Sequence, residues 1–390
     1  MDCFKPAAYS ASLLALVVLS SCFSTRTKTE SNSGPHVETQ RAPAETSNLC
    51  DLKSDRCKGR PLSPAQTAKS DTLTEEVAYQ LMEIEQMEKA AGRDFKVAVI
   101  GRMGSDLSSF QPLKDWDASK NRRLSKDELI QTIKLQSTGG ADSTNGINHY
   151  GLYQQYDRSR RLTYSHVGFA VKNLPVLDDH GKSLTNPKRG AWAIVHLLYS
   201  CEDEHMSYVF KGGLGSFFAD HLDGYGAQIL VPNQDIQNNL ERILVTDYIG
   251  KNWIEKQYNA LALPDDLNQQ NSNQYILEVL AAALYPPGQI KNREDAQAVL
   301  RKTGYSTTKI TPTGLYAAVR GAPGLVSKFM PTVCMDRQKS IWEYGVAEII
   351  SALSVEEYLV ANKRLSPLHG GQWEVSLTKE DLQKLDAIKK

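Results

Sequence analysis

The sequence has no excess of charge of either sign. Its 390 residues include 45 lysines and arginines and 45 aspartates and glutamates, so the formal net charge is zero. A nucleic-acid partner usually shows as a basic excess, and this balance therefore argues against one. Beyond residue 21 the sequence also lacks any apolar run of about 20 residues, the length needed to span a membrane.

Cysteine is scarce as well, with six residues in the chain. Two of them lie close to the N-terminus, at Cys3 and Cys22. The other four could form two disulfides in an oxidising compartment, and their pairing stays open. These four are Cys50, Cys57, Cys201 and Cys334.

The first residues have the pattern of a secretory signal peptide. Lys5 precedes an apolar run at 11–19, which is too short for a membrane span but suits the h-region of a signal. The next residues, Leu19-Ser-Ser-Cys22, resemble the lipobox of bacterial lipoproteins, where small residues precede the cysteine that is cleaved and lipidated. An ordinary secretory signal that contains a cysteine is the alternative interpretation.

The lipobox interpretation predicts how the N-terminal part is organised. Residues 1–21 are then the lipoprotein signal peptide, and Cys22 carries the lipid that attaches the chain to a membrane. Residue 23 is Phe and not Asp, which by resemblance to Gram-negative lipoproteins implies the outer membrane, facing the periplasm. Residues 22–60 have little to bury, so we expect a flexible tether there.

The remainder is expected to form one globular α+β domain over 61–360, because predicted strands gather in one part of it and predicted helices in another. Residues 111–161 read as an insertion and 361–390 as a C-terminal extension. Apolar patterning predicts strands at 95–101, 165–171, 191–198 and 227–232. Helical spacing and capping residues predict helices at 63–91, 233–250, 272–284, 292–304 and 341–359.

Two short segments carry the residue types of a catalytic site. His166 lies at the start of a predicted strand, and Ser272 lies in a polar turn that opens an apolar helix. Backbone N–H groups at a helix N-terminus stabilise negative charge and can form an oxyanion hole. A serine nucleophile there would need a general base, for which His166 is the candidate, and His196 on the next strand would orient that base.

These segments resemble the His-x-Gly motif and the nucleophile helix of circularly permuted NlpC/P60 hydrolases. The resemblance implies a papain-like core of antiparallel sheet and helices, and hydrolase or acyltransferase activity on an amide or ester without a required cofactor. It also implies cell-wall peptides or lipids as substrates. Ser272 stands where those enzymes have cysteine, so a catalytically inactive papain-like binding module of the cell envelope is the alternative.

A larger resemblance covers residues from about 60 to 310 and identifies the chain as a member of an uncharacterised bacterial family, domain of unknown function 2145. This family implies no established activity. The segments that carry the resemblance are Val97-Ala-Val-Ile-Gly-Arg102, Asp106-Leu-Ser108, Tyr164-Ser-His-Val-Gly168, Val195-His196, Gly212-Gly-Leu-Gly-Ser-Phe-Phe218, Asn271-Ser-Asn-Gln274 and Ala296-Gln-Ala-Val-Leu-Arg-Lys-Thr-Gly-Tyr305.

Purely structural roles remain open for the same residues. Asn271 and Gln274 have the spacing of a capping box, and Ser272 could serve as a helix cap that needs no base. His166 could be a hydrogen-bonded core histidine, and His196 lies in an apolar strand. Cys201 follows closely enough to be an alternative nucleophile, although a disulfide explains it as well.

The insertion contains a twelve-residue stretch at 117–128 that follows the EF-hand pattern of calcium ligands. Phe110 and Leu113 precede it where an entering helix is expected. The sixth position is Arg122 and not Gly, so any calcium site is expected to be weak, with a Kd of about 10⁻⁴ to 10⁻³ M. A polar helix-turn-helix without an ion is the alternative. The ligands would be Asp117, Ser119, Asn121, Arg123, Ser125 and Glu128.

Overall fold

A computed structural model describes part of the chain, and all of the described residues belong to one compact unit, Gln40–Lys390. The expected signal peptide, the tether and all six cysteines lie outside the described residues. Within them, no helix has both the length and the apolar character needed to cross a membrane. The described residues are 62–104, 164–176, 191–199, 206–219, 222, 224–245, 253–312 and 347–387, together with three short strands between 110 and 123.

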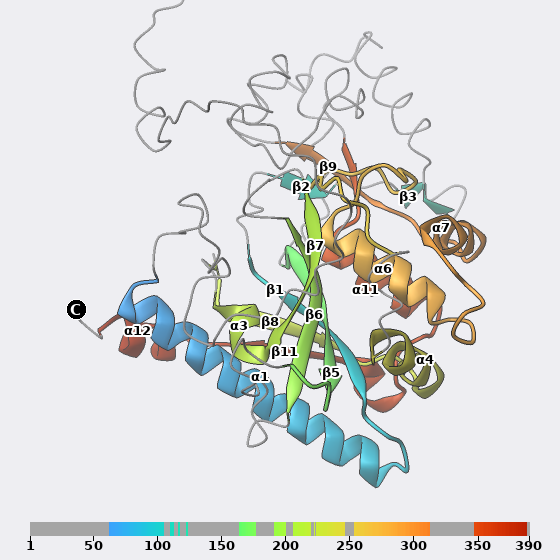
Figure 1. Ribbon diagram of the computed structural model, residues 1–390. Coiled ribbons are helices and arrows are strands. Elements are labelled where there is room, and N and C mark those ends of the chain that lie inside the picture. The colour runs from blue at the N-terminus through green and yellow to red at the C-terminus, as the bar shows by residue number, and fades with distance from the viewer. Residues whose placement is uncertain are drawn as a thin grey trace, which may run out of the picture. The chain divides into compact units, whose positions relative to one another are not determined.

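The main sheet has six antiparallel strands in the order β11-β8-β1-β5-β6-β7 (Figure 1). Four of them confirm the predicted strands to within two residues at their starts, whereas β7 and β11 were not predicted. Their bounds are β1 Val97–Arg102, β5 His166–Lys172, β6 Trp192–Tyr199, β7 Ser207–Gly213, β8 Gly226–Leu230 and β11 Gln372–Ser376.

Central strands of this sheet are buried on both faces. Every residue of β1 is buried, and successive side chains enter different core clusters. Val97 and Val99 belong to one cluster, whereas Ala98 and Ile100 belong to the other. Because successive side chains of a strand point to opposite faces, the apolar run of β1 requires a helical layer on each side.

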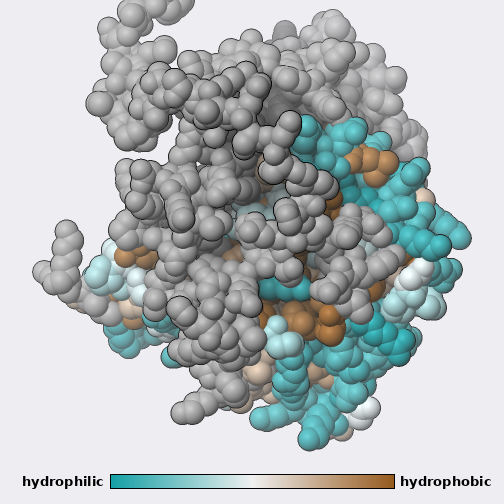
Figure 2. Space-filling model, in the orientation of Figure 1, coloured by the Kyte–Doolittle hydropathy of each residue, from teal (hydrophilic) through white to brown (hydrophobic). Residues whose placement is uncertain are grey.

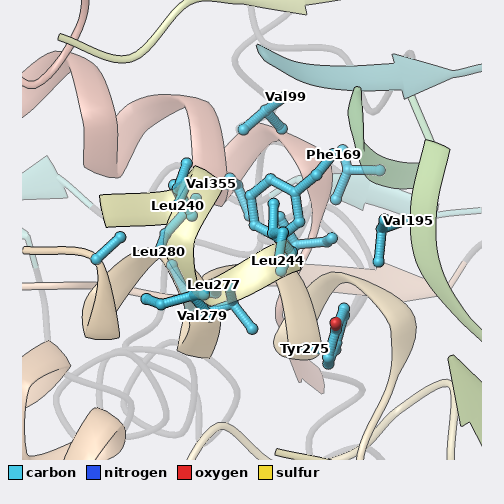
Figure 3. Close-up of a cluster of buried hydrophobic side chains, with 14 of the residues drawn as sticks. Val99, Phe169, Val195, Leu240, Leu244, Tyr275, Leu277, Val279, Leu280 and Val355 are labelled. Carbon is cyan, nitrogen blue, oxygen red and sulfur yellow. The ribbon is translucent and has the colours of Figure 1, made fainter. Parts of the chain in front are cut away.

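Four helices cover the first face. Figure 3 shows their core, in which Phe169 and Val195 of the sheet lie among side chains such as Leu240, Tyr275 and Val355. The helix α6 is buried along its whole length, which explains the apolar run at Tyr275–Leu277 and Val279–Ala282, whereas its buried polar residues need partners inside the protein. The four helices are α4 Gln234–Val245, α6 Ser272–Ala282, α7 Arg293–Lys302 and α11 Ala352–Ala361.

The second face is covered by α1 (Pro64–Ala90), α3 (Leu214–Phe218) and α12 (Lys379–Asp386). In Figure 1 the long helix α1 crosses the sheet on the side away from α6. The predicted start of α1 is confirmed, because Ser63 and Gln66 form a reciprocal capping box and a proline occupies the first turn. Its buried stripe is Leu73, Val77, Leu81 and Ile84.

One predicted helix is wrong over the described residues that precede Ser351. The helix expected over 341–359 is a strand at β10 (Ala347–Ile349), followed by α11, whose N-cap is Ser351. β10 pairs with β9 (Thr308–Pro312), a partner distant in sequence that a helical pattern cannot reveal. β9 also pairs with β2 (Phe110–Pro112), which completes a second sheet of three strands.

The α+β class is confirmed, with an antiparallel sheet between helices. The segment expected as a C-terminal extension supplies the strand β11 at the edge of the main sheet, after a short 3-10 turn, η6 (Leu368–Gly371). On the face drawn in Figure 2, hydrophilic residues cover most of the described surface, and hydrophobic ones gather in small groups.

Candidate functional site

Two histidines from neighbouring strands form a hydrogen-bonded pair. β5 begins at His166 and β6 carries His196, and their Nε2 and Nδ1 atoms are 2.7 Å apart. The two rings meet edge to face, with centroids 4.9 Å apart. This contact leaves the Nδ1 atom of His166 and the Nε2 atom of His196 for other partners.

Aromatic side chains enclose this pair on the α3 face of the sheet. His196 is fully buried between Phe210 and Phe217, with ring centroids at 5.3 and 5.2 Å, whereas His166 keeps 9% of its surface exposed. Gly168 allows this packing, because a Cβ there would lie 3.2 Å from the His196 Cβ and 3.3 Å from the Phe217 ring. The glycine of the His-x-Gly motif therefore has a steric role.

Both histidines are held in the neutral form. Burial lowers the pKa of His166 well below its usual value, and the nearby Arg102 guanidinium lowers it further. Burial and Arg102 lower the pKa of His196 in the same way. Arg102 is itself buried and donates to the backbone carbonyl of Phe217. A neutral imidazole keeps one nitrogen free to accept a proton, as a general base must.

The first turn of α6 lies on the other face of the sheet. Its N-cap is Asn271, whose side chain accepts from the backbone N–H of Gln274 at 2.7 Å, which is one of the two bonds of the predicted capping box. The Oε1 atom of Gln274, which would make the other bond, has no partner among the described residues. Ser272 is the first helical residue and not the cap, so the prediction that it caps the helix is wrong. It is 6% exposed.

Ser272 is engaged with a tyrosine that the sequence did not indicate. The hydroxyl and the backbone N–H of Ser272 act on the buried phenol of Tyr258 and lower its pKa, while burial raises that pKa by more. Among the described residues, no hydrogen bond joins Ser272 to His166. The structure therefore brings His166 and His196 into contact and places Ser272 against Tyr258.

Asn273 connects the two parts of the site. Its Oδ1 accepts from the backbone N–H of Val167 at 3.2 Å, and its Nδ2 donates to the carbonyl of Ser165 at 3.3 Å. These are the residues on either side of His166. The α6 turn that carries Ser272 is thus attached to the backbone that carries the histidine.

The predicted calcium loop is described only in part. Asp117 lies in β3 (Trp116–Asp117) and pairs with Arg122 in β4 (Arg122–Arg123). Phe110 lies in the strand β2, so the entering helix predicted at that residue is wrong. The described residues contain no group of three or more His, Cys, Asp or Glu side chains that could hold a metal. The other predicted ligands, Ser119, Asn121, Ser125 and Glu128, lie outside them.

Three residues of this site did not stand out as functional in the sequence. Arg102 ends a buried strand, and Asn273 lies between the two residues of the predicted capping box, but neither position reveals a contact with a distant segment. Tyr258 lies in an irregular segment without periodicity. A buried charged residue at a strand end was the one signal available, at Arg102.

These features define the chain as an α+β protein with a buried histidine pair beside the N-terminus of a helix. A family model described as "Uncharacterized protein conserved in bacteria (DUF2145)" matches residues 153–359, more than half of the chain. The chain belongs to this family. Neither the curated proteins nor the solved structures contain a match to it.

Proposed function

We propose that this chain is a hydrolase or acyltransferase of the bacterial cell envelope that acts on an amide or an ester. The observation that carries the proposal is the 2.7 Å hydrogen bond between His166 Nε2 and His196 Nδ1. A catalytic histidine needs one ring nitrogen held by an orienting group and the other free for the nucleophile. The contact with His196 leaves the Nδ1 atom of His166 for that second role.

Ser272 is the nucleophile in this proposal. Its hydroxyl oxygen attacks the substrate carbonyl carbon, and His166 takes the hydroxyl proton and passes it to the leaving amine or alcohol. Water, or an acceptor alcohol or amine, then cleaves the acyl-serine ester and restores the hydroxyl. The His166 ring lies on the α3 face of the sheet and Ser272 on the α6 face, so this step requires the His166 side chain to turn through the opening between β5 and β6 toward Ser272. Asn273 keeps the start of α6 attached to the backbone on either side of that histidine.

The order of the elements along the chain supports the finer assignment of fold. The histidine strand β5 comes first, the orienting strand β6 second, and the helix α6 third. The circularly permuted NlpC/P60 hydrolases have the same order around a papain-like core. We extend this proposal to the lipid anchor at Cys22, an outer-membrane location facing the periplasm, and cell-wall peptides or lipids as substrates. A weak calcium site at 117–128 remains part of the proposal.

A second candidate function has its own support. The phenol of Tyr258 interacts with both the hydroxyl of Ser272, which a nucleophile would use, and its N–H, which an oxyanion hole would use. A chain with these groups permanently occupied would be a catalytically inactive papain-like binding module of the envelope. The two candidates differ in whether residue 272 faces a usable base.

The test replaces Ser272 by Cys in the full chain and measures alkylation by iodoacetamide at pH 7. If His166 is a usable base, the thiol should react about tenfold faster or more than in the double variant S272C/H166Q, because a thiolate is the reactive form. The product is read from the mass of the peptide that contains residue 272, since the chain has other cysteines.

A thiol at Ser351 is the matched control. Ser351 begins α11 as its N-cap and is 3% exposed, so S351C measures what a helix N-terminus and burial do without a histidine. Equal rates for S272C, S272C/H166Q and S351C would contradict the hydrolase and favour the binding module. A rate in S272C that depends on His166 would support the hydrolase.

A further inference from the structure

The main sheet forks at the histidine pair. β1 and β5 stay paired as far as Arg102 and His166, and β6 stays paired with β7 as far as Tyr199. β5 and β6, in contrast, stop pairing at Phe169 and Val195. The two histidines therefore lie where their strands have already separated, and their rings bond across the opening.

The fork leaves backbone groups of β5 without a strand partner. His166 pairs with β1, and in an antiparallel strand the neighbouring carbonyl of Ser165 and N–H of Val167 then point the other way, toward β6. Buried backbone groups of this kind are nearly always hydrogen-bonded. Here the side-chain amide of Asn273 meets both of them, at 3.3 and 3.2 Å.

An amide is the side-chain group suited to this place. It has an acceptor and a donor side by side, as a strand backbone does, and Asn273 uses its second N–H on the carbonyl of Ile350 at 3.1 Å. Asn273 is 7% exposed, so its bonds are protected from water. A carboxylate would keep the bond from Val167 and lose both donated bonds.

We propose that Asn273 is a positioning residue: by replacing β6 along the end of β5, it sets the separation at which His166 and His196 form their hydrogen bond. The strands could otherwise pair further, which would place His196 opposite Gly168 and change the angle between the rings. The same residue follows Ser272, so it also fixes the distance between the helix start and the base. Its catalytic meaning rests on the proposed function, whereas its effect on the histidine pair does not.

The test compares Asn273→Leu with the unaltered full chain by NMR of the histidine rings labelled with ¹⁵N. Leucine keeps the volume and removes all three hydrogen bonds. We expect the resonances that report the His166–His196 hydrogen bond to change, and the His166 pKa to move toward its ordinary value of about 6.5 as the pair loosens. Ring shifts and titration unchanged from the unaltered chain would overturn the proposal.

Asn239→Leu is the matched control, because Asn239 also donates from Nδ2 to a backbone carbonyl, that of Ala283, at 3.0 Å. Its ring shifts should equal those of the unaltered chain, and equal changes in both variants would overturn a specific role. If Asn273→Leu does not fold, Asn273→Asp replaces it. Asp keeps the bond from Val167 and loses both donated bonds, so the ring resonances of the histidine pair should change, and unchanged resonances would overturn the proposal.

Failure of this proposal and failure of the proposed function can be told apart. A changed ring spectrum in Asn273→Leu together with an unreactive thiol in S272C retains the positioning role and rejects the hydrolase. An unchanged ring spectrum, together with a reactivity of the S272C thiol that depends on His166, rejects the positioning role and supports the hydrolase.

Discussion

Ser272 lies where the first N–H groups of α6 need partners from outside the helix. A helix leaves its first N–H groups without partners inside the helix. Asn271 accepts the N–H of Gln274, and the phenol of Tyr258 interacts with the N–H and the hydroxyl of Ser272. The tyrosine is thus a second cap, brought from an irregular segment by a bridge between Tyr258 and Gln270.

Replacing Tyr258 by Phe should destabilise the chain. The variant removes the phenol oxygen that interacts with the buried Ser272, and loss of a buried polar partner typically costs about 1–3 kcal/mol of unfolding free energy. Urea denaturation followed by circular dichroism measures this change. Tyr208→Phe is the control, since burial and the neighbouring Tyr199 are what raise the pKa of Tyr208, with no hydrogen bond to Ser272. Equal losses in both variants would remove the capping role from Tyr258.

At the scale of single residues, the sequence indicated the two histidines of the site but not the residues that hold the surrounding segments together. His166 and His196 stand in short apolar strands, where a polar residue is conspicuous, and their pairing was anticipated. Asn273 and Tyr258 have ordinary local surroundings, and their roles come from contacts between segments far apart in sequence. A local pattern holds no information about such contacts.

At the scale of the element, a buried charge joins α6 to α7. The Glu278 carboxylate is fully buried and accepts from Arg293 Nε at 2.8 Å. It also accepts from the amides of Gln270, Gln274 and Gln297 at 2.8, 3.2 and 2.9 Å. Burial raises the pKa of Glu278, and the Arg293 charge and the hydrogen bonds from Arg293, Gln297 and Gln270 lower it. The network holds α7 and the segment that precedes α6 against α6, the helix that carries Glu278.

Removing one partner of this ion pair should lower the free energy of unfolding far more than removing both partners. Glu278→Ala leaves Arg293 buried without its counter-charge, and the expected loss is about 3–5 kcal/mol of unfolding free energy. The double variant Glu278→Leu with Arg293→Met should recover a large part of it. Urea denaturation of the three chains measures the difference.

A surface pair supplies the control for that comparison. Lys384 and Glu380 are 2.8 Å apart on α12 but 68% and 76% exposed, so Glu380→Ala should change stability little. A double variant as unstable as Glu278→Ala would contradict the argument, because the loss would then come from packing and not from the unpaired charge.

Helices and strands were predicted accurately where local interactions determine them, and inaccurately where pairing with a distant segment does. The helix α1 was predicted almost to the residue, because the capping box of Ser63 and its apolar stripe are local. β10 was mistaken for helix, because its strand form depends on pairing with β9. β11 was missed, because it is an edge strand whose burial is partial and whose single partner, β8, lies far away in sequence.

At the scale of the whole molecule, the sheet between two helical layers gives the histidine pair its electrostatic properties. The pair lies on the α3 face, where Phe210 and Phe217 exclude water, and Arg102 adds a positive charge. Formation of the second layer is thus what makes both histidines neutral. The stability of the fold should therefore depend on pH through these two residues.

This linkage has a definite sign. In the unfolded chain each histidine binds a proton below about pH 6.5. In the folded chain the lowered pKa keeps both neutral, so unfolding takes up protons and the free energy of unfolding falls as the pH falls. Each histidine should contribute a slope of about 1.4 kcal/mol per pH unit below pH 6.5, and the contribution ends above that pH.

Urea denaturation at pH values between 5 and 7.5 measures the slope, with acidic groups acting as a common background. In His196→Phe the slope of the free energy of unfolding against pH should be smaller by the contribution of one histidine, because residue 196 no longer takes up a proton on unfolding. His369→Asn, which removes an exposed histidine from a turn with positive φ, is the matched control. If His196→Phe keeps the full slope, the pair binds protons in the folded chain, and a neutral His166 can no longer be assumed as the base for Ser272.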